Sequence, residues 1–169
     1  LLHMLMGLIF PDEGNLVINE KINYDIKYFS SLIKNISYIN QNPFFFEDTI
    51  INNICLKTEL SNDEQKKLEK IKEIVFGQDF FNKFSKGLNT VLNTSGLNLS
   101  TGQRQRINLA RGIFKESSII FMDEPTSALD YETESKILDN VFKSNLIKTA
   151  VVATHRKSIL DYCNKVIEI

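Results

Sequence analysis

Two carboxylates that follow a short, mostly apolar run are the residues of this sequence best suited to metal and water chemistry. The run spans residues 118–122, and Asp123 and Glu124 come directly after it. A carboxylate at the tip of a buried strand can hold a hydrated Mg²⁺ ion on phosphate groups, and a second carboxylate can orient or deprotonate an attacking water. The alternative is that Asp123, Glu124 and Pro125 simply cap the next turn.

Polar residues also follow two other predicted strands. Residues 36–39 lead to Gln41, and residues 149–153 lead to Thr154 and His155. Ligands of an open parallel sheet bind in the crevice beyond the carboxyl ends of its strands. We therefore expect these side chains to converge with the two carboxylates on one site.

A predicted helix over residues 101–115 begins with residues suited to holding an anion. Ser100 and Gln103 have the spacing of a capping box, and the start of the helix presents free N–H groups and the positive end of its dipole. Gly102 costs about 1 kcal/mol relative to alanine, which makes sense if a phosphate must approach the backbone closely. The alternative is an ordinary helix start.

The spacing of apolar residues predicts alternating strands and helices. The predicted strands span residues 16–18, 36–39, 118–122, 149–153 and 166–169, and the predicted helices span 1–8, 28–34, 49–54, 61–75, 101–115, 132–143 and 156–162. This alternation indicates an α/β fold with a mainly parallel sheet flanked by helices. Residues 47–96 are predicted to form an inserted helical subdomain, and residues 1–46 and 97–169 the catalytic core.

Composition excludes several classes of protein. The 169 residues are 43% hydrophobic and 24% charged, which is ordinary for one globular domain. A formal net charge of −1 lacks the basic excess expected of a protein bound to phosphate backbones, so we expect no nucleic acid partner. Cys55 and Cys163 have no metal-site spacing. No run approaches the roughly 18 apolar residues of a membrane span, so we expect any link to a membrane to run through another chain or domain.

The motifs together resemble the nucleotide-binding domain of an ATP-binding cassette (ABC) transporter over essentially the whole chain. In chain order they are the Q-loop glutamine Gln41, the signature 99–103 (LSTGQ), the Walker B strand 119–123, the adjacent Glu124, the D-loop 127–130 and the switch histidine His155. The resemblance implies a P-loop NTPase type of fold that uses ATP and Mg²⁺. It implies catalytic roles for Glu124 and His155, metal contacts for Asp123 and Gln41, and nucleotide contacts for Gln41, Ser100, Gly102, Gln103, Asp123 and Asp130.

The family's mechanism follows as a further implication. Two such domains, identical or different, face each other head to tail and trap two ATP molecules, each between the P-loop of one domain and the signature of the other. Hydrolysis reopens the pair and drives transmembrane domains that are fused to it or are separate subunits. The resemblance therefore places the domain at the cytoplasmic face of a membrane.

Within the family, the details favour exporters. Residues 42–54 are similar to the exporter segment in which aromatic residues meet the coupling helices of the membrane domain, and residues 90–96 occupy the place of the exporter loop before the signature. The cluster Phe44, Phe45 and Phe46 could instead be core of the helical subdomain, because aromatic runs are more often buried than displayed.

The sequence also departs from the family pattern. Thr101 replaces the first signature glycine, which predicts a weakened phosphate contact, and Thr94 and Ser95 replace the usual acidic and basic pair. No GxxxxGK[ST] motif is present. Leu1 and Leu2 match the residues that directly follow that motif, so we expect the chain to begin just inside the P-loop helix, without the N-terminal strands. As a fragment it is expected to be inactive and to expose a sheet edge.

Three functions are consistent with this sequence. The first is the ATP-hydrolysing motor domain of an exporter, and the second is a soluble ABC ATPase that acts on ribosomes or DNA. The third is a non-catalytic cassette that lends its signature to the ATP site of a partner. In this family selectivity lies in the membrane domains, so these residues do not specify a transported substrate.

Overall fold

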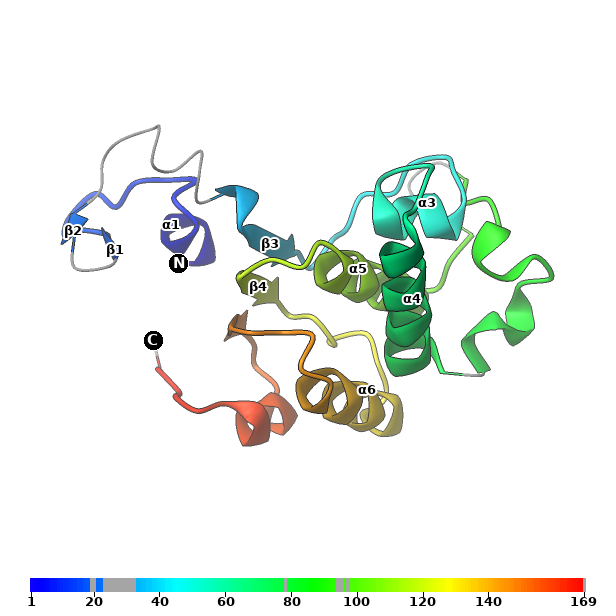
Figure 1. Ribbon diagram of the computed structural model, residues 1–169. Helices are drawn as coiled ribbons and strands as arrows, with labels where there is room; N and C mark the ends of the chain where they lie inside the picture. The colour runs from blue at the N-terminus through cyan, green and yellow to red at the C-terminus, as the bar shows by residue number, and fades with distance from the viewer. Residues whose placement is uncertain (19–20, 23–32, 78, 94–95, 97, 169) are drawn as a thin grey trace.

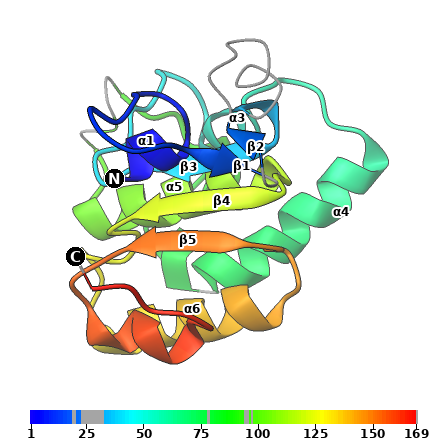
Figure 2. The same ribbon diagram turned by 90° about the vertical axis from the view of Figure 1, so that its left-hand side faces the viewer.

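The computed structural model describes residues 1–18, 21–22, 33–77, 79–93, 96 and 98–168. Its centre is a sheet of three parallel strands in the order β3 (Ile36–Ile39), β4 (Ile119–Asp123) and β5 (Ala150–Ala153) (Figure 2). The register places Ile39 beside Met122 and Asp123 beside Ala153. The three strands therefore end at the same edge, as predicted, and the parallel sheet flanked by helices is confirmed.

One face of the sheet is covered by the start of the chain. The short helix α1 (Leu2–Leu5) packs there, and Leu2 and Met6 form a small buried cluster with Ile36 and Phe121. An antiparallel pair, β1 (Val17–Ile18) and β2 (Lys21–Ile22), follows. The predicted strand 16–18 is thus present from Val17, whereas most of the predicted helix 28–34 lies outside the described residues.

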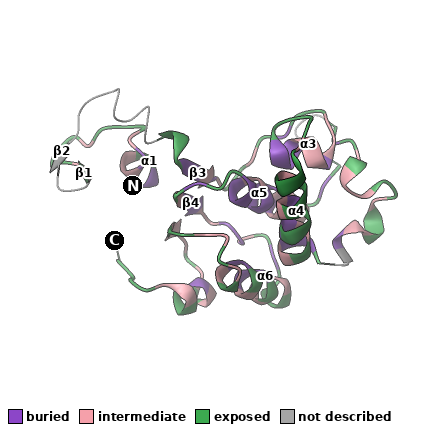
Figure 3. Ribbon diagram, in the orientation of Figure 1, coloured by how far each residue is buried: buried purple, intermediate pink, exposed green. Residues whose placement is uncertain are grey.

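The other face is covered by α5 (Thr101–Phe114), the most deeply buried helix in Figure 3. Ile107 and Ile113 of α5 share one hydrophobic cluster with Ile39 and Ile120 of the sheet. Gly112 brings the helix close to β3, since a Cβ there would lie 2.5 Å from Cγ1 of Ile39. Helix α6 (Tyr131–Lys143) and the 3₁₀ helix η5 (Lys157–Tyr162) follow β4 and β5.

The segment predicted as a helical subdomain forms short helices at the end of the molecule opposite both chain ends (Figure 1). These are α3 (Ile50–Cys55), α4 (Asn62–Ile71), the π-helical turn η1 (Lys72–Phe76) and the 3₁₀ helices η2 (Asp79–Lys83) and η3 (Gly87–Asn89). Helix α4 begins with a capping box, in which both bonds between Ser61 and Glu64 are present. Leu68 and Phe76 share the hydrophobic cluster of α5, so this segment packs directly on the core.

The predicted strand 166–169 is wrong. Residues 163–168 form neither strand nor helix, and Val166 and Ile167 are 51% and 71% exposed. A strand needs a neighbour that pairs with its backbone groups, and none of the described strands lies alongside these residues. Among the described residues, no helix is both long and apolar enough to span a membrane.

Candidate functional site

Glu124 follows β4 directly and is held against the segment that follows β5. Its backbone N–H donates to the carbonyl of Ala153 at 2.9 Å, which continues the pairing of the two strands. Its carboxylate accepts a hydrogen bond from the backbone N–H of His155 at 2.7 Å and another from the Thr154 hydroxyl at 3.3 Å. The structure therefore brings together the two predicted catalytic residues, and His155 itself is exposed.

The backbone of Glu124 has an uncommon conformation. Its φ of 46° lies in the left-handed region, which costs on the order of 1–3 kcal/mol unless the surroundings impose it. The surroundings here include a hydrogen bond from Nε2 of Gln105 to the Glu124 carbonyl at 3.2 Å. Together with the two bonds to the carboxylate, this contact fixes the direction in which Glu124 points.

Asp123 lies on the same face of the sheet as Tyr38, on the neighbouring strand. The negative charge of the Asp123 carboxylate acts on the Tyr38 hydroxyl. Burial, and then the negative charge of Asp123, raise the pKa of that hydroxyl above its usual value. Tyr38 was not predicted as a site residue, because only the strand register brings it beside Asp123.

Gln41 lies two residues beyond β3, at the edge where β4 delivers Asp123, and it is exposed. The buried Asn108 of α5 donates through Nδ2 to the carbonyl of Asn40 at 2.9 Å and so anchors the end of β3. Among the described residues no hydrogen bond joins Gln41 to Asp123 or Glu124. The structure thus places Gln41 at the predicted edge, not hydrogen-bonded to either carboxylate.

The start of α5 has the predicted capping box. The Ser100 hydroxyl accepts a bond from the backbone N–H of Gln103 at 3.2 Å, and the Gln103 side chain accepts one from the backbone N–H of Ser100 at 2.8 Å. This helix start opens into a hollow of about 590 Å³, which we call the signature hollow. Its lining includes Ser100, Gly102, Gln103 and Arg106 of α5, Asp130, and Phe80 of η2.

The predicted site residues therefore form two groups. Ser100, Gly102, Gln103 and Asp130 line the signature hollow, whereas Gln41, Asp123, Glu124 and His155 do not and lie at the sheet edge. Asp130 also caps α6, because its carboxylate accepts the backbone N–H of Thr133 at 3.0 Å. That hydrogen bond lowers the pKa of Asp130 below its usual value.

Gly102 has a packing role inside this chain. A Cβ at Gly102 would lie 3.1 Å from Cδ2 of Leu129 and 3.2 Å from the carbonyl oxygen of Ala128. The D-loop thus lies directly against the first turn of α5. This contact is a reason for glycine independent of the predicted close approach of a phosphate.

Gln105 connects the site residues at the sheet edge with those of the signature hollow. It was not predicted as a site residue from the sequence. Its Nε2 donates to the Ser127 hydroxyl at 2.7 Å as well as to Glu124, and its Oε1 accepts the backbone N–H of Ala128 at 2.8 Å. The side chain is almost fully buried. The sequence did hold a signal for Gln105: it is a polar residue on the buried face of an amphipathic helix, and a buried polar group needs hydrogen-bond partners.

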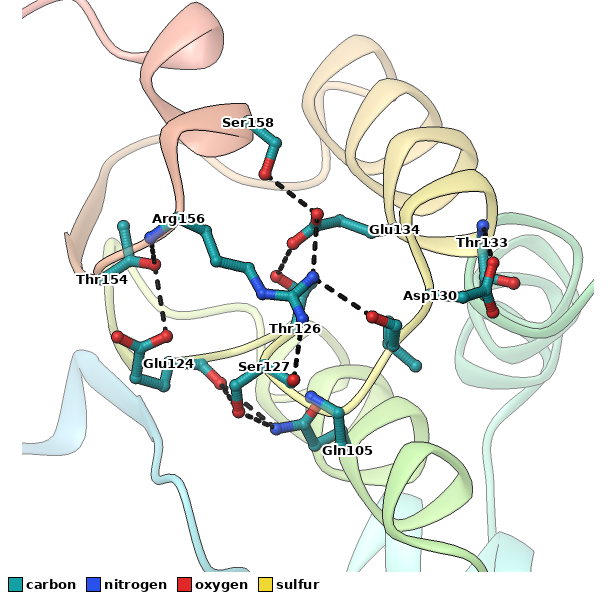
Figure 4. A network of polar contacts seen from close by, with 12 residues as sticks. Gln105, Glu124, Thr126, Ser127, Asp130, Thr133, Glu134, Thr154, Arg156 and Ser158 are labelled. Atoms are coloured by element: carbon teal, nitrogen blue, oxygen red, sulfur yellow. Dashed lines mark hydrogen bonds and ion pairs between the residues drawn. The ribbon is translucent and has the colours of Figure 1, made fainter.

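Arg156 and Glu134 form a second connection that was not predicted (Figure 4). The Arg156 guanidinium donates to the carbonyls of Ser127 at 2.8 Å and Leu129 at 3.1 Å, and its Nη1 lies 3.0 Å from Glu134 Oε2. Glu134 shares the apolar face of α6 with Ile137 and is only 1% exposed. The sequence signal for this pair was a glutamate in the apolar stripe of a helix, because a buried carboxylate needs a partner.

A sequence model of the family described as "ABC transporter" matches residues 1–127 of this chain. The chain belongs to the ABC transporter family. The predicted membership, with its exporter-type likeness, is confirmed by proteins of known structure or function that are similar to it.

Two curated relatives of this ABC domain are flippases. The ATP-dependent lipid A-core flippase of Escherichia coli (strain K12) is 36% identical over 162 residues, which are 92% of this chain and 26% of that protein. The protein of the same name from Salmonella typhimurium (strain LT2) is 35% identical over the same shares. The chain thus spans about a quarter of the length of these relatives. A solved bacterial Atm1-family ABC exporter with ATP bound matches with a TM-score of 0.80 and 29% identity, over 95% of this chain and 28% of that one.

The three consecutive phenylalanines of the ABC domain divide between the two predicted alternatives. Phe45 is 1% exposed and belongs to the core, whereas Phe44 and Phe46 are 60% and 54% exposed and contact each other edge to face. Arg111 of α5 fixes this segment. Its guanidinium donates to the carbonyls of Asn53 at 2.7 Å and Phe44 at 2.8 Å and lies 5.0 Å from the centre of the Phe45 ring.

Of the residues that depart from the family pattern, the structure describes only Thr101. Thr101 is exposed in the first turn of α5 and lines the signature hollow, so its side chain stands where the family has only a glycine hydrogen. Thr94 and Ser95, in the loop before the signature, lie outside the described residues.

Proposed function

We propose that, within the complete protein that contains it, this chain binds and hydrolyses ATP as the motor domain of an ABC exporter at the cytoplasmic face of a membrane. The observation that carries this proposal is the fixed Glu124 carboxylate, held by the His155 N–H beside Asp123 at one end of a parallel sheet. That edge is where ligands of such sheets bind. The relatives support an exporter, because they are named as flippases and as an ATP-bound exporter.

The residues at the sheet edge fit a Mg²⁺ ion that is bound together with a nucleotide. Carboxylate and amide oxygens, from Asp123 and Gln41, are the hard ligands that this ion prefers. The described part of the chain has no cluster of three or more His, Cys, Asp or Glu that could hold a metal by itself. That agrees with an ion held by one or two protein oxygens together with phosphates and water. When bound, Mg²⁺ neutralises charge on the phosphates.

Glu124 has the position of the group that orients or deprotonates the attacking water. Each carboxylate oxygen has more than one lone-pair site, so bonds to His155 and Thr154 leave capacity for a water. The exposed side chain of His155 is free to approach a terminal phosphate. In this scheme Glu124 accepts a proton from the attacking water, and His155 positions the phosphate.

The division of the site residues supports a shared arrangement of two domains. Ser100, Gly102 and Gln103 line a hollow separate from the edge with Glu124. We propose that the signature hollow receives the nucleotide of a second nucleotide-binding domain, identical or different, and that transmembrane domains, fused or separate, are moved by closure of the pair. Residues 47–96 form the helical subdomain of this motor, and residues 1–46 and 97–169 its core.

The experiment is a Mg²⁺ titration of ATP hydrolysis by the complete protein that contains this chain. The unaltered protein is expected to hydrolyse ATP with Mg²⁺ and to lose that activity when EDTA removes the metal. Asp123→Asn is expected to need more Mg²⁺ for half-maximal activity, because it removes the charged ligand. Asp63→Asn, at the exposed ion pair of Asp63 with Lys66 on α4, serves as the matched control.

Two results would contradict this proposal. Hydrolysis that persists unchanged in EDTA would remove the role given to the metal. Binding of ATP without any hydrolysis would favour the non-catalytic cassette instead.

A further inference from the structure

The buried carboxylate of Glu134 is surrounded by donors from three segments. It accepts hydrogen bonds from the hydroxyls of Thr126, before the D-loop, and Ser158, in η5, the latter at 2.9 Å. Arg156, between β5 and η5, supplies the positive charge at 3.0 Å. A charge this deeply buried is stable only when it is paired and hydrogen-bonded. Glu134 therefore anchors the Arg156 side chain inside the molecule.

The anchored Arg156 contacts the D-loop with the remaining donors of its guanidinium. These donors bind the carbonyls of Ser127 at 2.8 Å and Leu129 at 3.1 Å, one on each side of Ala128 (Figure 4). Ala128 and Leu129 are the residues that pack against Gly102 at the rim of the signature hollow. A displacement of these carbonyls would therefore change the wall of the hollow.

The backbone of Arg156 reaches the other group of site residues. Its N–H donates to the Thr154 hydroxyl at 3.0 Å, and that hydroxyl donates to the Glu124 carboxylate at 3.3 Å. One residue is thus linked through its side chain to the D-loop and through its backbone to Glu124.

We propose that Arg156 is a positioning residue that sets the D-loop and the Glu124 carboxylate in one common geometry, with Glu134 as its buried anchor. This inference rests on the proposed ATP hydrolysis at Glu124. Arg156 contacts no reacting group and acts through the D-loop carbonyls and Thr154. Its guanidinium is essential for this role because a planar fork spreads its donors in a fixed geometry over two carbonyls and a carboxylate, which the compact ammonium group of lysine does not reproduce.

The test separates the fork of Arg156 from the charge of the pair. Arg156→Lys keeps a positive charge near Glu134 but loses the fork. Glu134→Gln removes the anchoring charge but keeps an amide oxygen that can accept from Arg156, so the D-loop contacts stay in place. In the complete protein, Arg156→Lys is expected to lower kcat for ATP at least about tenfold and to leave the melting temperature little changed. Glu134→Gln is expected to lower the melting temperature and to change kcat by less than about threefold. The exposed neighbour Lys157→Ala is the control and is expected to change neither.

A double variant distinguishes positioning from simple stabilisation. Arg156→Met alone leaves Glu134 buried without its partner, but Arg156→Met with Glu134→Leu removes both charges, a replacement that is often neutral for stability. The double variant is expected to regain the melting temperature lost by the single variant and to keep its low kcat. Recovery of kcat together with the melting temperature would overturn the proposal, because Arg156 would then only stabilise the fold.

Hydrogen exchange gives a readout that does not depend on hydrolysis. Arg156→Lys is expected to increase the exchange rates of the backbone amides of residues 127–130 and 154–155. Glu134→Gln is expected to increase these rates less. Unchanged exchange in Arg156→Lys would overturn the inference. If the unaltered protein does not hydrolyse ATP, the proposed function fails, and the exchange data still decide whether Arg156 holds the D-loop.

Discussion

Replacing Glu124 with glutamine is expected to lower the steady-state ATP turnover of the complete protein by about 10²- to 10⁴-fold, the usual contribution of a positioned proton-transfer group. Glutamine has nearly the same shape and keeps a carbonyl oxygen for the N–H of His155, so the site should keep its geometry. ATP binding is therefore expected to persist while hydrolysis falls. The measurement is steady-state phosphate release beside equilibrium binding of ATP.

Glu132→Gln is the matched control for Glu124→Gln. Glu132 lies on the exposed face of α6, where it pairs with Lys136 at 2.7 Å. An exposed ion pair contributes only about 0–1 kcal/mol, so this variant should retain normal turnover. Normal turnover in Glu124→Gln itself would contradict the role given to that carboxylate.

Phe45→Ala is expected to destabilise the domain by about 3–5 kcal/mol, because it empties a fully buried aromatic site. The Phe45 ring lies beneath the Arg111 guanidinium and against Gly96, where a Cβ would come within 2.9 Å of it. At about 2–4 °C per kcal/mol for a domain of this size, the midpoint of thermal inactivation should fall by at least about 6 °C.

The neighbours of Phe45 provide a direct comparison. Phe44→Ala and Phe46→Ala remove side chains that are more than half exposed, and exposed substitutions usually change stability by less than about 0.5 kcal/mol. Their midpoints should therefore stay near that of the unaltered protein. A fall as large as that of Phe45→Ala would mean that all three rings belong to the core.

Local patterns were sufficient to predict the framework of this fold. The strand 36–39 has its predicted bounds, and the capping box at Ser100 has both of its bonds. These features depend on residues a few positions apart, whose period or spacing is read directly from the sequence. The common edge of Gln41, Asp123 and His155 followed from one general property, the parallel direction of the strands.

Long-range contacts account for what was missed. Tyr38 reaches Asp123 only because the strands pair in a given register, and Gln105 joins α5 to the D-loop across more than twenty positions. Arg156 and Glu134 meet for the same reason, after a helix and a strand have been placed. The alternating exposure of Phe44, Phe45 and Phe46 depends on a backbone that follows neither helix nor strand. The strand 166–169 was predicted from apolar residues alone, and no described strand lies beside residues 166–168.

We propose above all that Glu124 and Ser100 of one chain serve different ATP molecules. It is tested by the ATP turnover of mixed dimers made from two differently tagged copies of the complete protein. Glu124→Gln in one copy and Ser100→Arg in the other would then place both defects in one site and leave the second site intact. The same two substitutions in a single copy, paired with an unaltered partner, would damage both sites. We predict clearly higher turnover for the first dimer, and higher turnover for the second would contradict the claim.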